Sequence, residues 1–413
     1  MMFKNKPGAA APVPVDSSRP KPNRVAVPSI ISALVLSLGA FAALSWDMQA
    51  DPRRVALAYL VAYAFGISIP LGVLAWSMIC DACGAVWFVP LRRVADGITA
   101  CFPGMALLFL PVPLSLPLIY PWAHHVHGLK QGIDASHAGY LNPTAFTLRA
   151  IVCFAVWIGI AETMRSWSLT QERPDAPDRT SRRRALAAVG LLPVVLTVTC
   201  MAIDWYLSLD ATWFSSVYGL LHLAGDGSAG IAAMVMVFAA LSPRRGSPAG
   251  RLPSSVGAEH AHALGSLLFV SVMFWAYLSF MQFLIIWMAD LPNEAGWYVV
   301  RLGGTWGWLG LIVLAAHFVV PFALLLSTSV KRRLAVLSGV AFLVLMAHYG
   351  DLYWQLVPAI SPGGSSLRWC DVAALIAVLS GGAACGLWRA RGLSPIPTHD
   401  PDLAEGLRYR SLR

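Results

Sequence analysis

Ten long apolar runs constrain this chain more than any other feature of its sequence. They lie at about 26–46, 55–79, 98–119, 144–166, 185–208, 212–241, 262–288, 304–328, 334–357 and 371–388. A run of roughly 20 apolar residues is long enough to cross a bilayer as an α-helix. Of the 413 residues, only 12% are charged, against about 25% in a soluble domain. The sequence therefore predicts an all-α integral membrane protein with about ten transmembrane helices.

The third run is the least regular of the ten. It contains four prolines, Pro103, Pro111, Pro113 and Pro117. Proline lacks an N–H and clashes with the preceding turn, so each one breaks or kinks a helix. Membrane proteins tolerate such breaks where neighbouring helices satisfy the freed backbone groups. We therefore expect a kinked span that is packed against other helices.

The basic residues indicate which helix ends face the cytoplasm. With the N-terminus placed inside, most of the 30 Lys and Arg residues fall in inner segments, and outer loops hold few. This asymmetry is what the positive-inside rule describes. We expect both termini in the cytoplasm, a disordered tail over 1–25, a transmembrane domain over 26–388 and a C-terminal tail over 389–413. The net charge of +9 then reflects topology, and no nucleic-acid partner is expected.

The cysteines and the surface histidines give weaker signals. Cys80 and Cys83 form a C-x-x-C, but Gly84 stands where a c-type haem attachment site would have His. We therefore interpret the seven cysteines as small apolar residues and expect no metal site in the chain. The segment PWAHHVH at 121–127 is compatible with a metal or with a subunit contact in an outer loop.

Ionisable residues within apolar runs are the main candidates for function. A charge at the centre of a membrane helix costs roughly 2.5–3.5 kcal/mol, and such residues normally face the interior of a helix bundle. From the predicted topology we place several near the outer side, three at middle depth and two near the inner side. In that order they are Arg149, Asp204, Asp210, His348, Asp351 and Asp371; His222, Asp226 and His317; Glu162 and Arg165.

Several of these residues also have a structural interpretation. Glu162 and Arg165 are three apart, which suits an ion pair on one helix face. Arg149 lies close enough to the outer surface to extend toward it, and Asp210 can cap a helix starting near Ala211. Asp204 lies deeper than Asp210, which leaves a hydrogen bond to a neighbouring helix or a role in proton handling or ligand binding.

The buried histidines suggest either a proton relay or packing between polar groups. His222 and Asp226 are four apart and share a helix face, and His348 and Asp351 are three apart. Pro321 cannot donate to the carbonyl of His317, which loosens the helix at that residue. Haem b is disfavoured, because no run carries two histidines about four turns apart.

Several stretches resemble a known family. They are AGYLNPTAFTLRA at 138–150, DWYLSLDATWFSSVYG at 204–219, the run from Leu264 to Arg301, HFVVPFALLLSTSVKRR at 317–333 and DLYWQLVP at 351–358. Together they are similar to the NrfD or polysulfide-reductase membrane-anchor superfamily. Within it they resemble the second NrfD-like subunit of bacterial alternative complex III, a quinol:acceptor oxidoreductase. The resemblance covers roughly residues 26–388 and departs from the family pattern at Ala263, Ser266 and Met281–Gln282.

The resemblance implies an architecture and a set of partners. It implies two four-helix bundles formed by the second to fifth and the sixth to ninth helices, with the first and last helices outside. It implies no covalently bound cofactor in this chain, but a quinol site, a transmembrane proton path, or both. Expected partners in the bacterial inner membrane are a paralogous NrfD-like subunit, an iron–sulfur subunit, multihaem c-type cytochromes that carry haem c, and membrane lipids.

We therefore expect one outer pocket and one inner branch of ionisable residues. The outer pocket would comprise Asp204, Asp351, His348 and Arg149, and a raised pKa would let Asp204 accept a proton from quinol. The inner branch would comprise Glu162, Asp226, His222 and His317. A stand-alone secondary transporter and a purely structural anchor for a redox complex are the alternative functions.

Overall fold

The computed structural model describes residues 26–123, 139–172, 177–210, 213–243, 252–253, 255–364 and 367–411. Within these ranges the chain is helical, with no strand. Ten helical segments in them are long and apolar enough to cross a membrane. Their bounds are Val27–Asp47, Pro52–Ala82, Val86–Leu114, Pro143–Thr170, Thr180–Leu209, Tyr218–Leu241, Ala258–Ala289, Gly304–Leu325, Leu334–Ala359 and Trp369–Ala390. The predicted fold class, an all-α multi-pass membrane protein, is confirmed.

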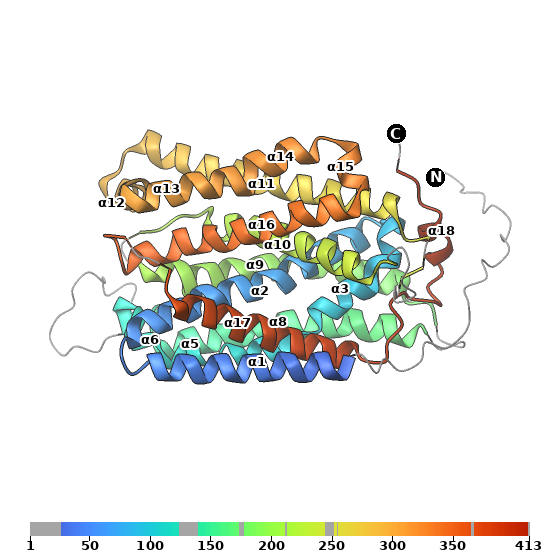
Figure 1. The fold of residues 1–413 in the computed structure, drawn as a ribbon, viewed down its shortest axis with the longest axis horizontal. Coiled ribbons are helices and arrows are strands. Elements are labelled where there is room, and N and C mark those ends of the chain that lie inside the picture. Colours follow the sequence, from blue (N-terminus) through green and yellow to red (C-terminus); the bar gives the residue numbers. More distant parts are fainter. Residues whose placement is uncertain are drawn as a thin grey trace.

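The spans form two groups of four, with one pair of helices alongside (Figure 1). The first group holds α2 (Pro52–Ala82), the broken third span, α8 (Pro143–Thr170) and α9 (Thr180–Met201). The second holds α10 (Tyr218–Leu241), α11 (Ala258–Ala289), the span from α13 (Gly304–Val313) to α14 (Val320–Leu325), and α16 (Leu334–Leu356). Outside both, α1 (Ala26–Asp47) packs along α17 (Trp369–Ala390).

The third span is broken as its prolines predict. It consists of η1 (Val86–Leu91), α3 (Arg92–Thr99), α4 (Phe102–Leu108), α5 (Pro111–Leu114) and α6 (Leu116–Ile119), so it starts well before residue 98. Two tyrosines of α2 satisfy carbonyls along it. The hydroxyl of Tyr59 donates to the carbonyl of Leu108 at 2.6 Å, and that of Tyr63 to the carbonyl of Met105 at 2.8 Å. These bonds from a neighbouring helix are what a broken span needs inside a membrane.

The sixth span begins later than its sequence predicts. α10 starts at Tyr218 rather than near residue 212, and Asp210 follows a short 3₁₀ turn, Leu207–Leu209, in extended backbone geometry. The predicted cap by Asp210 on a helix at Ala211 is therefore wrong. Trp213, in the segment before α10, is buried and stacks on Trp297 of α12 (Pro292–Leu302) with a centroid distance of 4.6 Å.

Glycines let α2 and α10 touch backbone to backbone. A Cβ on Gly72 would lie 1.7 Å from the carbonyl oxygen of Asp226, and one on Gly230 would lie 2.4 Å from the amide nitrogen of Val73. Small residues at a helix crossing allow this close approach in membranes. The contact places α10, with His222 and Asp226, at the centre of the molecule beside the almost wholly buried α2.

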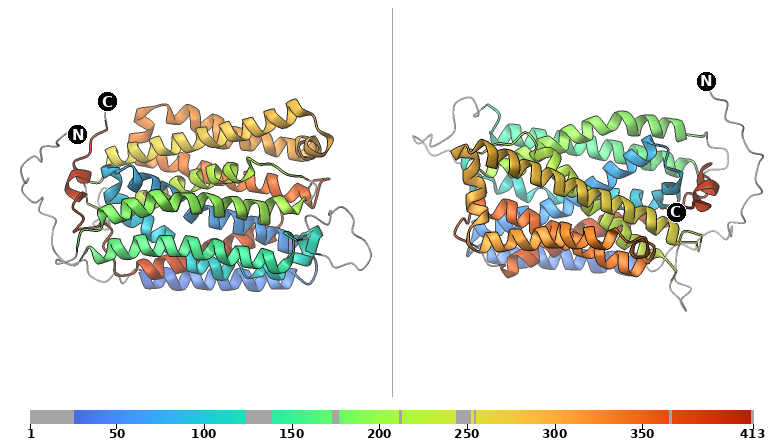
Figure 2. Two further views of the ribbon diagram at one scale, coloured as in Figure 1. Left: turned by 180° about the vertical axis from the view of Figure 1, so that it is seen from behind. Right: turned by 90° about the horizontal axis from the view of Figure 1, so that it is seen from above.

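The two ends of the bundle differ in character (Figures 1 and 2). The end that carries α15 (Thr328–Arg332) and α18 (Leu403–Leu407) is here named the α18 end, and the opposite one, with α12 (Pro292–Leu302), the α12 end. The C-terminal segment packs on the α18 end: α18 lies against η1, and the carbonyl of Gly406 is 3.1 Å from Nε2 of His260. The predicted C-terminal tail is thus a docked segment.

Candidate functional site

The first buried ionic contact joins α8 to the end of the fifth span. Nε of Arg149 donates to Oδ2 of Asp204 at 2.6 Å. Asp204 lies in a π-helical segment, Ala202–Tyr206, that follows α9 directly. Such segments occur frequently at functional sites, because the extra residue in the turn redirects side chains. The side chain of Asp204 is 2% exposed and that of Arg149 is 21% exposed.

This contact shows which of the structural interpretations of Arg149 and Asp204 holds: Asp204 bonds to a neighbouring helix, through Arg149. Arg149 binds Asp204 instead of extending to the surface, and the ring of Tyr140 lies 3.8 Å from its guanidinium carbon. The thiol of Cys200 is 3.8 Å from the same carboxylate oxygen. In the described part of the chain, Oδ1 of Asp204 and Nη2 of Arg149 are buried without a hydrogen-bond partner. One acceptor and one donor therefore remain free at this contact, which we name the Arg149–Asp204 pair.

The second buried cluster lies in the other helix group. Three buried residues, His317, His348 and Asp351, each place one potential metal-ligand atom within 4.8 Å of the other two. His317 lies in a second π-helical segment, Leu314–Val319, just before Pro321. Among the residues described, all four ring nitrogens of the two histidines lack a hydrogen-bond partner. The predicted loosening at His317 is present, and we name this group the histidine cluster.

Surrounding side chains fix the histidine cluster in place. Nε1 of Trp275 donates to Oδ2 of Asp351 at 3.0 Å, and its ring lies 4.0 Å from that of His317. His348 packs against Gly225 of α10, where an added Cβ would meet its ring at 2.9 Å. Trp275 lies in α11, within the run from Leu264 to Arg301 that carries part of the family resemblance. Its indole N–H also orients the carboxylate of Asp351.

His222 packs against two tyrosines. Its ring is tilted against that of Tyr206 and meets that of Tyr218 edge to face, with centroid distances of 4.6 and 4.5 Å. Tyr206 belongs to the same π-helical segment as Asp204. His222 and Gly225, which touches His348, are three apart on α10 and share a face. The observed contacts in this region are thus Tyr206 with His222, and Gly225 of the same helix α10 with His348.

Asp226 is one turn along α10 from His222 and is 2% exposed. No hydrogen bond joins it to His222 among the described residues, and its Oδ2 has no partner there. Beyond it toward the α18 end, α10 carries the fully buried apolar residues Ile231, Met234 and Phe238. The inner branch stays a prediction.

Glu162 pairs with two arginines, Arg389 and Arg165. It accepts a hydrogen bond from Nη2 of Arg389 at 2.6 Å and lies 3.8 Å from Nη1 of Arg165. The predicted pairing of Glu162 with Arg165 is present, as the weaker of the two contacts. The structure therefore groups Glu162 with the α18 end and not with the histidines.

Sequence reasoning missed a network of buried ion pairs at the α18 end. Asp81 accepts from Nη2 of Arg92 at 2.9 Å and from Nε of Arg183 at 2.6 Å. Arg92 also pairs with Asp400, and Arg183 with Asp96 at 3.4 Å. The sequence does contain a sign of this network: the arginines lie in two runs, Arg92–Arg93 and Arg182–Arg184. The positive-inside rule explains these runs by topology alone.

Near the α12 end, Asp371 also has a partner that the sequence did not suggest. Nη2 of Arg54 donates to Oδ2 of Asp371 at 2.5 Å and to the hydroxyl of Tyr353 at 3.1 Å. This pair ties the start of α2 to the start of α17, so we assign Asp371 to structure. The four loop histidines, His124, His125, His127 and His137, lie outside the described residues.

The chemistry open to these sites follows from their free atoms. The Arg149–Asp204 pair offers a donor and an acceptor to a polar ligand. In the histidine cluster, two imidazoles and a carboxylate form a set that would suit a transition metal such as Zn²⁺ or a string of proton carriers. Comparison with known proteins adds nothing to this geometry, because no protein-family model and no curated protein matches the chain.

Proposed function

We propose that this chain is a membrane subunit of a bacterial quinol:acceptor oxidoreductase of the alternative complex III type. In this proposal it lies in the inner membrane and contributes a quinol site, a proton path, or both. Its partners are a paralogous NrfD-like subunit, an iron–sulfur subunit and multihaem c-type cytochromes. The partners hold the redox groups that receive the electrons. The proposal rests on the sequence resemblance together with the geometry of the two buried sites.

The observation that carries the proposal is the pair of π-helical segments. Each helix group has one, and each places a buried ionisable residue, Asp204 or His317, among polar atoms that lack partners within the described chain. Buried polar groups without partners are costly and need an explanation. Among the described residues, the structural Arg54–Asp371 pair also leaves buried polar atoms without partners, but it lies outside both π-helical segments. The coincidence of such atoms with a π-helical segment is therefore what favours a site that binds a ligand or carries protons.

Quinol oxidation releases two electrons and two protons. In the proposal the electrons pass to the partner subunits, and the protons need acceptors within this chain, next to the quinol. In our proposal the free Oδ1 of Asp204 accepts the proton of one quinol hydroxyl. Nη2 of Arg149 donates a hydrogen bond to the quinol oxygen that loses this proton. In the same proposal the histidine cluster takes up or relays the proton that follows, and the contact of Tyr206 with His222 on α10 supports a connection between the two sites.

The experiment compares the intact complex carrying Asp204→Asn with the wild-type complex. Asn keeps the shape of the side chain but cannot accept a proton at this pH, so we expect quinol oxidation to fall at least about tenfold, in the range of general-base effects. The control is Asp290→Asn, because Asp290 is exposed near the α12 end and has a left-handed φ of 47° that Asn tolerates.

Proton release per quinol is measured alongside turnover. A complex with His348→Gln that oxidises quinol normally but releases fewer protons assigns the histidine cluster to the proton path. A fall in both quantities assigns it to the quinol site. Wild-type turnover and proton release in the Asp204→Asn complex, with all subunits present, would contradict the proposal.

A further inference from the structure

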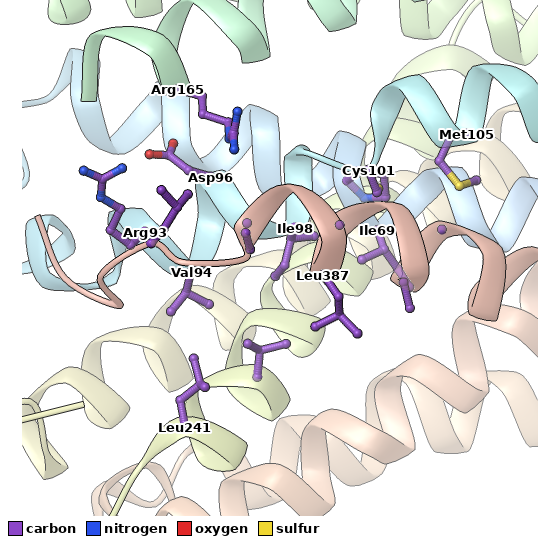
Figure 3. Close-up of a pocket in the computed structure, with 18 of the residues that line it drawn as sticks. Ile69, Arg93, Val94, Asp96, Ile98, Cys101, Met105, Arg165, Leu241 and Leu387 are labelled. Carbon is purple, nitrogen blue, oxygen red and sulfur yellow. The ribbon is translucent and has the colours of Figure 1, made fainter. Parts of the chain in front are cut away.

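A cavity of about 480 Å³ lies in the half of the bundle next to the α18 end. Its walls come from α2, α3, α4, α8, α10 and α17 and from Leu393 to Pro395 after α17 (Figure 3). It is separate from the Arg149–Asp204 pair and the histidine cluster, none of whose residues line it. Sites of about 300–1,000 Å³ hold small molecules or parts of larger ligands, so this volume is large enough for a ligand.

The cavity is long and mostly apolar. On α17 its lining runs from Val378 to Ala390, which at 1.5 Å per residue spans about 18 Å along the bundle. Three glycines, Gly66 on α2 and Gly382 and Gly386 on α17, belong to the lining and let α17 pack closely against its neighbours, because an added Cβ would meet Val378, Met105 and Gly97, respectively. An elongated apolar space parallel to the helices fits an extended hydrocarbon chain better than a compact ring system.

One end of the cavity is polar. Arg93, Asp96 and Arg165 gather there, whereas Met105 and Ile69 lie toward the other end (Figure 3). Arg93 and Asp96 are both 6% exposed. Nη2 of Arg93 pairs with Glu172 and donates a hydrogen bond to the carbonyl of Ser168. Within the described residues its Nε and Nη1, and Oδ2 of Asp96, remain buried without a hydrogen-bond partner.

The charges around this end are balanced. The ion pairs that include the lining residues Arg93, Asp96 and Arg165, or that continue from them, join five arginines to five carboxylates: Arg92, Arg93, Arg165, Arg183 and Arg389, with Asp81, Asp96, Glu162, Glu172 and Asp400. A purely anionic head group would add an unbalanced charge here. A zwitterionic head group adds none, and it supplies an acceptor for the free arginine donors and a donor for the free carboxylate oxygen.

We propose that this cavity binds an aminophospholipid, such as phosphatidylethanolamine, as a resident lipid. One acyl chain fills the apolar length beside α17. The phosphate accepts hydrogen bonds from Arg93 or Arg165, and the primary ammonium donates to Asp96. The polar end lies at the α18 end, where the head groups of that leaflet would be. This site does not depend on the proposed redox function.

The test uses the purified full chain in nanodiscs of equimolar phosphatidylethanolamine, phosphatidylcholine and phosphatidylglycerol with added ubiquinone. After transfer to mild detergent, native mass spectrometry identifies the retained molecules. We expect one phosphatidylethanolamine per chain, retained at least fivefold over each other component. Ala383→Phe, which fills the cavity from α17, should abolish retention. Its control is Val372→Phe, on the exposed face of α17.

A second variant tests the head group. Asp96→Asn should remove the preference for phosphatidylethanolamine over phosphatidylcholine, because the quaternary ammonium of choline has no N–H to donate. Arg182→Gln, an exposed arginine at the α18 end, should leave the preference unchanged. Preferential retention of phosphatidylglycerol or ubiquinone, no retained lipid in the wild type, or equal retention in Ala383→Phe and the wild type would each overturn the proposal.

Discussion

Asp81 is a buried carboxylate that pairs with two buried arginines, Arg92 and Arg183, one at each of its oxygens. Removing one member of a buried ion pair leaves an uncompensated charge and costs about 3–5 kcal/mol. We therefore expect Asp81→Asn to lower the stability of the chain by several kcal/mol. A thiol-reactive dye measures this on heating, because Cys80, Cys101 and Cys370 are buried and free.

The control for Asp81 is Asp402, which pairs with Arg184 at 2.9 Å in a largely exposed setting. Such a pair contributes about 0–1 kcal/mol, so Asp402→Asn should leave the unfolding midpoint almost unchanged. Equal midpoints for Asp81→Asn and Asp402→Asn would show that the buried network does not stabilise the fold.

Asp51 gives a prediction that depends on pH. Its carboxylate accepts from the amide of Arg54 at 3.2 Å, which caps α2, and from Nη1 of Arg368 at 2.7 Å. The hydrogen bond from Arg368 holds the pKa of Asp51 below its usual value. The stabilisation is therefore complete above the ordinary pKa of about 3.9 and is lost as the pH falls through the lower folded value.

We expect Asp51→Ala to cost about 1 kcal/mol at neutral pH, as for a lost helix cap, and Asp51→Ser to cost less because Ser still caps. As the pH falls through the lowered pKa of Asp51, the wild type and Asp51→Ala should converge. Unfolding midpoints from neutral pH down to well below the ordinary pKa of about 3.9 measure this. A constant difference between them over that range would contradict the assignment.

At this scale the sequence predicted local partners and missed distant ones. Glu162 and Arg165 are three apart, so helix periodicity alone placed them together. Asp204 and Arg149 are 55 positions apart, and their contact depends on how α8 packs on α9. Depth alone placed both residues in one expected outer pocket with His348 and Asp351, whereas the structure pairs Asp204 with Arg149 in one helix group and holds His348 and Asp351 in the other. Single-sequence patterns carry no information on that packing.

At the scale of elements, the crossing of α2 and α10 depends on glycine. Gly72 faces the backbone of Asp226, which cannot move aside as a flexible side chain can. We expect Gly72→Ala to separate the two helices and to lower stability by more than the roughly 1–3 kcal/mol that an added methylene costs in a packed core. It should also displace Asp226, so it should impair turnover of the complex.

Gly159 on α8 is the matched control, because a Cβ there meets nothing within 4 Å. Ala is the better helix former by about 1 kcal/mol, so Gly159→Ala should be at least as stable as the wild type. Thermal unfolding of both variants in one detergent makes the comparison. A Gly72→Ala chain as stable as Gly159→Ala would mean that the two backbones do not touch.

Helix irregularities divide into those that sequence predicts and those that it does not. The breaks in the third span follow from its prolines, which act locally. The π-helical segment at Ala202–Tyr206 contains no proline or glycine, so nothing local marks it. There the bonding pattern is set by tertiary contacts, such as the hydrogen bond from the hydroxyl of Tyr120 to the carbonyl of Trp205 at 2.7 Å.

At the scale of the whole molecule, the apolar runs were sufficient to predict ten membrane-spanning segments, because the thickness of a bilayer fixes their length. The grouping into two sets of four, expected from the resemblance, is also what the helices show. The docking of the C-terminal segment was not predictable, since its residues are polar and resemble a solvated tail. Its attachment relies on single matched contacts such as Arg92 with Asp400.

That attachment leads to a prediction about the whole molecule. Removing residues 399–413 takes away Asp400, one of the two carboxylates of buried Arg92, and also α18, which covers η1. We expect a loss of about 3 kcal/mol or more, as for a buried pair that loses one partner, and faster proteolysis at the α18 end only. Asp400→Asn in the full chain should reproduce the electrostatic part and Leu403→Ala the packing part, while exposed Glu405→Gln changes neither. A truncated chain with wild-type unfolding and cleavage would mean that the segment does not hold the helix ends together. The lipid cavity, whose lining includes Leu393, Ser394 and Pro395 just before the cut, would then be closed by the helices alone.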